Sequence, residues 1–463
     1  MRMPWACWLL LFVFSITPLR GAEPLRLATF QVDATPPLGS PLCEGAVPPA
    51  KEIVDRLSAR GLILVGSGPP VCLVAVDWVG IANASHDRWR ETLAGAIGTS
   101  ADRVAVHALH QHDAPGIDES SEALLAARGM RGQIYNAESA EQVLRTAADA
   151  ARAAMQQLTP ATHLGVGIGV VEGVASNRRI LGADGRVQHV RFSSCKDEAV
   201  RAAPEGTIDP RVRLISLWSQ DRPLVVLSYY ATHPQSYYGQ GGVSADFVGM
   251  ARALREAAVP GVPHIHFNGA GGNVAAGKYN DGSPAMRPIL AERLAVGMQR
   301  AWEATERRPI DGAALAWNTT VAKMPLRDIV QDESALARVL DDAAAPQAER
   351  MRAARDLAYC LRVREGKHPV IACLGLGPDI RVLHMPGELF VEYQLAAQQM
   401  APQATVCMAA YGDYGAGYIG TAIAYSQGGY ETSPVSRTAP EVEESLMTAM
   451  RQLLKADATA KPN

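Results

Sequence analysis

The sequence predicts an α/β fold: a mixed β-sheet core flanked by helices, in a single large domain whose candidate site lies at strand-end loops. Apolar runs with strand-like patterns alternate along the chain with segments of helical periodicity, as in layered α/β proteins. Side chains that could carry chemistry recur where such an apolar run ends. With 463 residues, of which 48% are hydrophobic, the chain can bury a substantial core, and no repeat or clear linker divides it.

The first half of the chain supplies five predicted strands and two predicted helices. Residues 25–33 alternate polar and apolar side chains, whereas residues 71–76 form a continuous apolar run of the kind that is buried on both faces. A helix that begins at Ser85 places Trp89, Leu93 and Ile97 on one face. We expect strands over residues 25–33, 61–65, 71–76, 103–108 and 162–174, and helices over residues 85–98 and 136–158.

The second half continues the alternation. Residues 212–218 and 223–230 predict an antiparallel pair, because a short polar turn joins two apolar runs. Residues 332–361 are rich in alanine and charge and predict one or two surface helices. We expect further strands over residues 263–267, 313–322, 380–385 and 405–410, and further helices over residues 247–257, 285–305, 389–400 and 440–454.

The N-terminal segment predicts export. Residues 1–22 have a short basic start, an apolar stretch too short to span a membrane comfortably and a small-residue end, typical of a secretory signal cleaved after Ala22. We therefore expect a secreted or periplasmic protein without a transmembrane segment in residues 23–463. The six cysteines of that segment permit disulfides, but no Cys-x-x-Cys pair supports a thiolate zinc site. A net charge of −3 with both signs interspersed argues against nucleic-acid binding.

Residues 104–116 hold the densest group of reactive side chains. Three imidazoles and a carboxylate, those of His107, His110, His112 and Asp113, occur within seven positions where a predicted strand ends. Residues two apart in an extended segment project to the same side, so His110 and His112 would face one space. One of them could bind a metal and the other could move a proton, although His-x-His also occurs in solvated loops.

Three further strand-end loops offer groups that zinc accepts. His233 follows the strand at 223–230, and Glu388 follows the strand at 380–385. With His110 or His112 they would form a catalytic zinc set, two imidazoles and a carboxylate. Zinc lowers the pKa of a bound water to about 7, which would supply a nucleophile for acyl compounds. The third loop is aromatic and glycine-rich, and its candidate tyrosines are Tyr414, Tyr418 and Tyr425.

Two other loops could either take part in a functional site or be ordinary surface loops. Arg178 and Arg179 could clamp an anion or an oxyanion, but paired arginines in a loop also occur on solvated surfaces. Residues 268–274 are glycine-rich without the Gly-Lys-Ser/Thr ending or the spacing of phosphate-binding loops. We interpret this turn as a close approach of the backbone to a ligand or metal site.

A family resemblance links these pieces. The run Leu109-His-Gln-His-Asp-Ala-Pro-Gly116 resembles the Thr-His-Thr-His-Ser-Gly-Pro signature of the neutral/alkaline, non-lysosomal ceramidases. Further similar segments follow in the family's order and together extend over nearly all of residues 23–463. These segments are Asp33-Ala-Thr-Pro36, Asn177-Arg178, Thr232-His-Pro-Gln-Ser236, residues 268–274, Pro386-Gly-Glu388, and Tyr418-Ile-Gly-Thr421 with Tyr425 and Tyr430-Glu431.

The resemblance implies a metallo-amidase catalytic domain over residues 23–463. It implies a zinc cofactor, a zinc-bound water as nucleophile, and a small-molecule acyl amide or ester as substrate, with lipids such as sphingolipids among the candidates. It also implies that His112 is the general base and that Arg178 and a tyrosine steady the oxyanion; we choose Tyr430 for that tyrosine, with Tyr425 as the alternative. The implied zinc ligands are His110, His233, Glu388 and Tyr418.

Two departures from the family pattern keep a second interpretation open. The family has Gly-Asp-Val-Ser-Pro-Asn where residues 272–277 read Gly-Asn-Val-Ala-Ala-Gly, so Ala275 replaces a serine with a catalytic or substrate-contacting role. Ceramidases also continue into a C-terminal immunoglobulin-like domain, which we do not expect here; this departure leaves the proposed site residues intact. The alternative is therefore a non-catalytic lipid- or glycan-binding protein that keeps the ceramidase-like site. Phosphoester or glycoside hydrolysis fits less well, because the sequence shows no second metal cluster and no convincing acid pair.

Overall fold

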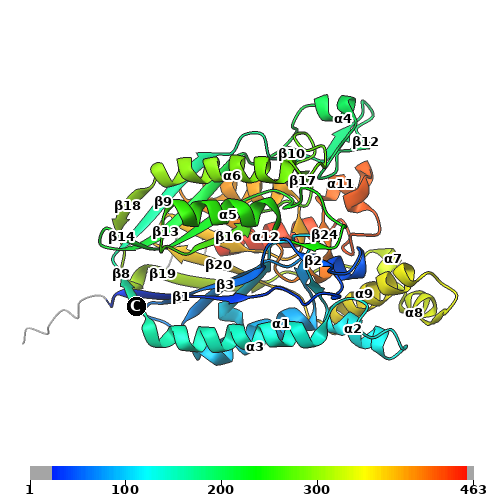
Figure 1. Cartoon of the computed structure of the whole chain (residues 1–463), viewed down its shortest axis with the longest axis horizontal. Helices are drawn as coiled ribbons and strands as arrows, with labels where there is room; N and C mark the ends of the chain where they lie inside the picture. Colours follow the sequence, from blue (N-terminus) through cyan, green and yellow to red (C-terminus); the bar gives the residue numbers. More distant parts are fainter. Residues whose placement is uncertain (1–22, 456–463) are drawn as a thin grey trace, which may run out of the picture.

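Two five-stranded mixed sheets lie face to face between two layers of helices (Figure 1). The computed structural model describes residues 23–455. The strand order of the first sheet is β6-β4-β3-β1-β8, and helices α1 (Ala84–Ile97) and α3 (Ala137–Ala154) cover its outer face. Its strands are β1 (Leu25–Asp33), β3 (Ser58–Val65), β4 (Val71–Val76), β6 (Val104–Ala108) and β8 (Thr159–Ala161).

The second sheet has the order β16-β14-β13-β9-β18, with helices α5 (Asp246–Ala258) and α6 (Met286–Glu303) on its outer face. Strands β13 and β14 pair antiparallel, as the sequence predicts, while β14 and β16 run parallel. Its strands are β9 (His163–Val170), β13 (Arg211–Ser219), β14 (Arg222–Tyr230), β16 (His264–Asn268) and β18 (Glu306–Pro309).

A third, four-stranded sheet completes the core. It has the order β19-β20-β21-β23 and packs against helices α10 (Val391–Met400) and α12 (Val442–Lys455). Its strands are β19 (Leu315–Val321), β20 (Val370–Leu376), β21 (Ile380–His384) and β23 (Thr405–Ala409). The remaining α-helices are α2 (Glu119–Ala126), α4 (Glu198–Ala202), α7 (Asp328–Gln331), α8 (Glu333–Asp341), α9 (Gln347–Arg364) and α11 (Ala422–Gln427).

The hydrophobic core between the sheets explains the continuous apolar runs of the sequence. Leu62 and Leu73 of the first sheet, Leu227 and Phe267 of the second and Val382 of the third belong to one buried cluster. Each large apolar side chain that is removed from water contributes about 1.5–3 kcal/mol to folding. The three sheets therefore form one body, and the mixed α/β architecture that the sequence predicts is confirmed.

Short paired segments at the strand ends shape the loops. The parallel pairs are β2 (Glu52–Ile53) with β15 (Gly242–Val243), β5 (Gly80–Ile81) with β7 (Gly116–Ile117), and β22 (Glu388–Leu389) with β24 (Tyr418–Ile419). The antiparallel pairs are β10 (Ser176–Asn177) with β17 (Val274–Ala275), and β11 (Arg179–Leu181) with β12 (Val187–Val190). Except for β11–β12, they join segments that are far apart in sequence.

Three expectations about individual elements need correction. Helix α2 was not anticipated, because its eight residues lie directly after the histidine loop and are capped by Asp118 instead of being preceded by a long periodic pattern. Strand β20 was also missed. Residues 332–361 are not surface helices throughout, since α9 buries Ala354, Leu357 and Tyr359 against the core. Its buried face is made largely of alanine, which weakens the apolar signal.

Several sequence-based expectations concern the chain termini and cysteines. The predicted signal, residues 1–22, lies outside the described residues. Among residues 23–455, no helix is long and apolar enough to cross a membrane. Cys43, Cys72, Cys195, Cys360 and Cys407 are present as thiols.

Candidate metal centre

Four strand-end segments converge on one buried cluster. His110 lies in the loop that follows β6, and His233 lies in the loop that follows β14. Glu388 and Tyr418 stand opposite each other at the start of the parallel pair β22–β24. All four side chains are buried. The structure therefore brings together the four residues that the family resemblance implies as zinc ligands.

The two histidines face each other through their Nε2 atoms. His110 donates through Nδ1 to the Val79 carbonyl at 2.7 Å, and His233 donates through Nδ1 to the Gly271 carbonyl at 3.0 Å. Burial, together with nearby His110 and Arg178, lowers the pKa of His233 well below its ordinary value. In a neutral ring with a protonated Nδ1, Nε2 is a bare acceptor. The two Nε2 atoms lie 3.2 Å apart, so two lone pairs converge where a cation would satisfy both.

A carboxylate oxygen completes this group of acceptors. Glu388 Oε2 lies 3.2 Å from His110 Nε2 and 3.5 Å from His233 Nε2, and it is buried without a hydrogen-bond donor. The other oxygen, Oε1, accepts a hydrogen bond from the Tyr414 hydroxyl at 2.7 Å. A buried acceptor without a donor is costly unless a ligand satisfies it. Two imidazoles and a carboxylate form a donor set that zinc prefers, so these residues fit the metal.

Tyr418 supplies the fourth oxygen of the cluster. Its hydroxyl lies 3.4 Å from His233 Nε2 and accepts a hydrogen bond from Arg178 Nη1 at 3.0 Å. Burial raises the pKa of Tyr418 well above its ordinary value, although the Arg178 charge acts in the opposite direction. Tyr414, which the sequence left as an alternative, contacts Glu388 and not the histidine nitrogens. Of the candidate tyrosines, Tyr418 therefore lies closest to a ligand position.

His112 lies at the edge of the cluster and is half-buried. Its Nδ1 donates to the His110 carbonyl at 3.1 Å, which leaves Nε2 as an acceptor. Burial, with His110 and Arg178 nearby, lowers the pKa of His112 well below its ordinary value. One ligand nitrogen from each of His110, His112 and His233 falls within 4.8 Å of the others. The geometry thus permits His112 to accept a proton beside the centre or to serve as a third imidazole ligand.

Arg178 and Tyr430 lie on the other side of Tyr418. Arg178 is buried, its Nε lies 3.1 Å from Glu431 Oε1, and its guanidinium carbon lies 5.5 Å from the centre of the Tyr430 ring. Tyr430 lines the cavity over the cluster, whereas Tyr425 does not. The Tyr425 hydroxyl instead contacts Ser436 Oγ at 3.2 Å and Thr438 Oγ1 at 3.0 Å. The structure therefore groups Arg178 with Tyr430 and places Tyr425 away from the cluster.

A cavity of about 250 Å³ opens over this cluster. His110, His112, Glu388 and Tyr418 line it together with Tyr238 and Tyr430, whereas His233 does not reach its surface. Other lining residues come from the first loop of the chain, from α9 and from residues 434–437. A small molecule in this cavity would reach the candidate metal ligands that line it and His112 at the same time.

The backbone that presents His110 is strained. His110 has a φ of 65°, in the left-handed region that residues other than glycine rarely adopt. The His110 N–H donates to the Trp78 carbonyl at 2.7 Å, which holds this conformation. Strain of this kind costs about 1–3 kcal/mol and is concentrated at functional sites. It turns the His110 ring toward His233 and Glu388.

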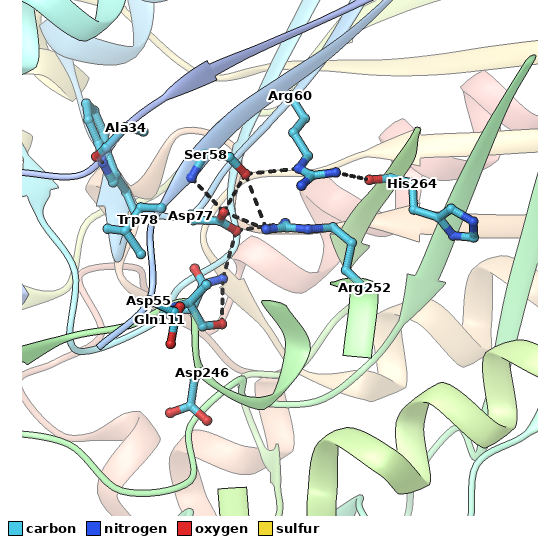
Figure 2. A network of polar contacts seen from close by, with 12 residues as sticks. Ala34, Asp55, Ser58, Arg60, Asp77, Trp78, Gln111, Asp246, Arg252 and His264 are labelled. Carbon is cyan, nitrogen blue, oxygen red and sulfur yellow. Dashed lines mark hydrogen bonds and ion pairs between the residues drawn. The ribbon is translucent and has the colours of Figure 1, made fainter. Parts of the chain in front are cut away.

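A buried ion pair supports the histidine loop from behind (Figure 2). Asp77 is fully buried and accepts two hydrogen bonds from Arg252, at 2.9 and 2.7 Å. It also accepts one from Ser58 Oγ at 2.7 Å and one from Gln111 Nε2 at 3.1 Å. Burial alone would raise the pKa of Asp77, but Arg252 and Ser58 hold it below its ordinary value. Because Gln111 lies between His110 and His112, this network fixes both histidines.

Arg287 of α6 joins the two histidine loops. It donates through Nε to Ser236 Oγ at 2.9 Å and through Nη2 to the Tyr237 carbonyl at 2.7 Å, both in the loop that follows His233. The same Nη2 lies 3.5 Å from a carboxylate oxygen of Asp113, next to His112, and 3.5 Å from one of Asp246. Sequence analysis missed Asp77, Arg252 and Arg287, since no local motif marks a residue that acts through distant loops.

The fold of this chain is similar to that of solved ceramidase structures. No protein-family model matches the chain, and no curated protein matches it. A ceramidase complexed with C2 has a TM-score of 0.69 and 15% identity, with coverage of 95% of this chain and 77% of that chain. The neutral ceramidase from Pseudomonas aeruginosa has a TM-score of 0.68 and 16% identity, with coverage of 94% and 75%. The fold is ceramidase-like. At this level of identity, the similarity establishes the architecture and leaves the chemistry to the site.

The glycine-rich turn of this ceramidase-like chain lies directly behind the cluster. The Gly271 carbonyl accepts from His233, and a Cβ atom on Gly272 would lie 2.3 Å from the Glu388 carbonyl oxygen. Close approach of the backbone therefore requires glycine here. Ala275, where the resembling family has serine, is fully buried in β17 opposite Ser176 and does not line the cavity.

Proposed function

We propose that this protein is a zinc-dependent hydrolase of amide or ester bonds. The observation that carries the proposal is the convergence of His110 Nε2, His233 Nε2 and Glu388 Oε2 beside a cavity that His110 and Glu388 line, with the buried Glu388 oxygen left without a hydrogen-bond donor. The ceramidase-like fold supports an amide as the bond that is cleaved. Export to a periplasmic or extracellular location is part of this proposal and rests on the pattern of residues 1–22.

His110, His233, Glu388 and Tyr418 would hold the zinc. When bound, zinc supplies a water whose pKa falls to about 7 and a Lewis acid for a carbonyl oxygen. The contacts that orient these ligands are already in place, because both histidines donate through Nδ1 to backbone carbonyls and Glu388 accepts from Tyr414. Such contacts fix the tautomer and the orientation of metal ligands.

His112 would move the proton. Its Nδ1 is held by the His110 carbonyl, so Nε2 can take a proton from the attacking water and return it to the leaving amine. This role and a ligand role for His112 are distinguishable, because only the second requires His112 for metal binding. Arg178 and Tyr430 would steady the negative charge that develops on the carbonyl oxygen, since preorganised donors stabilise that charge most in a buried site.

The alternative is a non-catalytic binding protein for a lipid or a glycan. Ala275 favours this alternative, because a position that carries a serine hydroxyl in the resembling family carries none here. Ala275 is buried and does not line the cavity, so the missing hydroxyl is only weak support for a binding protein. A missing hydroxyl at this position removes no atom of the proposed proton path through His112.

The test is an activity panel with the zinc-loaded protein. It should contain acyl amides and acyl esters of several chain lengths, including ceramide, and each assay should be repeated after zinc removal and reconstitution. We expect hydrolysis of at least one amide or ester that zinc removal abolishes and zinc addition restores. Binding of acyl compounds without turnover of any of them would favour the binding protein instead.

A further inference from the structure

The cavity over the candidate metal centre has one aromatic side. Tyr238 and Tyr430 line it and are 45% and 38% exposed, and Phe192, which packs against Tyr430 beside the lining, is 46% exposed. The Tyr430 ring centre lies 5.4 Å from that of Phe192 and 5.7 Å from that of Tyr418, and the Tyr238 ring lies 5.0 Å from that of His112. An acyl chain could lie against these rings next to the proposed catalytic groups.

The other side of the cavity is basic. Arg352 and Arg355 come from one turn of α9, and Arg437 comes from the segment that precedes α12. Two carboxylates also line the cavity, but Glu388 is directed at the histidines and Glu44 forms an ion pair with Arg355. Positive charge therefore exceeds negative charge on this wall.

The guanidinium groups of Arg352 and Arg355 have N–H donors without an acceptor among the described residues. Arg352 is exposed and has no ion pair or hydrogen bond within residues 23–455. Arg355 Nε is buried and has no hydrogen-bond acceptor there. The counterion of Arg437 is Asp356, at 2.7 Å, which does not line the cavity. An anionic group of a ligand would satisfy the unused donors of this wall.

We propose that the substrate is an acyl amide whose amine part carries a carboxylate, the N-acyl amino acid class. This inference rests on the proposed amide hydrolase. The acyl chain would lie against the aromatic side, the amide over the candidate metal ligands, and the carboxylate against Arg352 and Arg355. Tyr414 lies between these regions, because it donates to Glu388 and lines the cavity together with Arg355.

Hydrolysis of this substrate needs only water as co-reactant. The amide carbon–nitrogen bond breaks, and a bond forms between the carbonyl carbon and the water oxygen. One water proton goes to the nitrogen of the amine that leaves as the amino acid, and the other is released when the acyl product ionises to a carboxylate. The cavity volume of about 250 Å³ suits a short or medium acyl chain, because pockets for drug-sized ligands measure about 300–1,000 Å³.

The experiment compares two probes that differ in one charge, N-octanoylglycine and N-octanoylglycinamide, by the release of octanoate. The zinc-loaded protein should prefer the charged compound about tenfold in kcat/KM at low ionic strength, and salt should reduce this ratio. Arg352→Gln should bring the ratio toward one. Arg451→Gln, which removes an equal charge from an exposed position of α12 outside the cavity, should leave the ratio unchanged.

Binding measurements separate this inference from the proposed function. Titration calorimetry with both compounds tests recognition of the carboxylate even if neither compound is hydrolysed. Tighter binding of N-octanoylglycine, lost in Arg352→Gln, would support the inference although the hydrolase proposal had failed. Equal turnover of the two compounds by the unmodified protein, or equal binding where there is no turnover, would overturn the inference while leaving hydrolysis of neutral amides possible.

Discussion

Replacement of Arg287 with alanine should destabilise the fold and loosen the candidate metal centre together. Arg287 lies between two buried carboxylates, Asp113 and Asp246, at 3.5 Å from each. Burial raises the pKa of both carboxylates, and the Arg287 charge opposes that rise. Without Arg287 both carboxylates would be buried without a counterion, which costs about 3–5 kcal/mol when one partner of a buried pair is removed. The loss should shrink as the pH is lowered, because protonation removes the buried charges.

The same substitution should weaken zinc binding. Asp113 follows His112 directly, and the Ser236 and Tyr237 contacts of Arg287 lie just after His233. Loss of an outer contact of this kind typically lowers metal affinity about 10–100-fold. Urea unfolding at several pH values measures the stability, and competition with a chromophoric chelator measures the zinc affinity.

Arg300→Gln is the matched control, because Arg300 lies on the same helix in an exposed pair with Glu172 and should change the stability by no more than about 0.5 kcal/mol. If Arg287→Ala does not fold, Arg287→Lys keeps the charge and should retain part of the zinc affinity. A folded Arg287→Ala variant with unchanged stability and unchanged zinc affinity would refute the role of Arg287 as a link between the loops.

Three further predictions concern single residues. His112→Ala should keep its zinc but lose about 10²–10⁴-fold in activity as expected for a general base, whereas loss of zinc would make His112 a ligand. Burial raises the pKa of Asp118 to about 6, so its contribution to stability is greatest below the pKa of the unfolded chain and is lost as the pH rises through about 6. The unfolding free energy of Asp118→Asn relative to the unmodified protein should therefore rise between about pH 4 and about pH 7, and a constant difference in urea unfolding would contradict this. Ala275→Ser should leave the substrate preference unchanged in a parallel assay with the unmodified protein, because residue 275 is fully buried and does not line the cavity, and a shift of turnover toward ceramide would contradict this.

Local patterns in the sequence were sufficient for most of the fold. The alternation in residues 25–33 and the apolar runs at 71–76 and 223–230 predict strands that the structure contains as β1, β4 and β14. These strands are buried on one or both faces, so their patterns follow directly from packing. Helix α2 was missed because it is short and capped by a single side chain, whereas β20 is an apolar run like residues 71–76 and could have been predicted from the same pattern.

Local sequence patterns predicted only part of the candidate metal centre. Spacing suggested that His110 and His112 share one space, and their ring centres lie 4.7 Å apart. No spacing could show that His233 and Glu388 reach the same place, because that depends on the pairing of strands far apart in the chain. The choice between Tyr425 and Tyr430 likewise depended on the path of a glycine-rich loop, which local patterns do not determine.

Zinc content tests the central claim most directly. Protein reconstituted with zinc and freed of excess metal should retain about one zinc per chain by mass spectrometry of the metal. His233→Ala should lose that zinc, while His189→Ala, an exposed histidine of β12, should keep it. Absence of zinc from the unmodified protein, or a full complement of zinc in folded His233→Ala, would contradict a metal centre built on His110, His233 and Glu388.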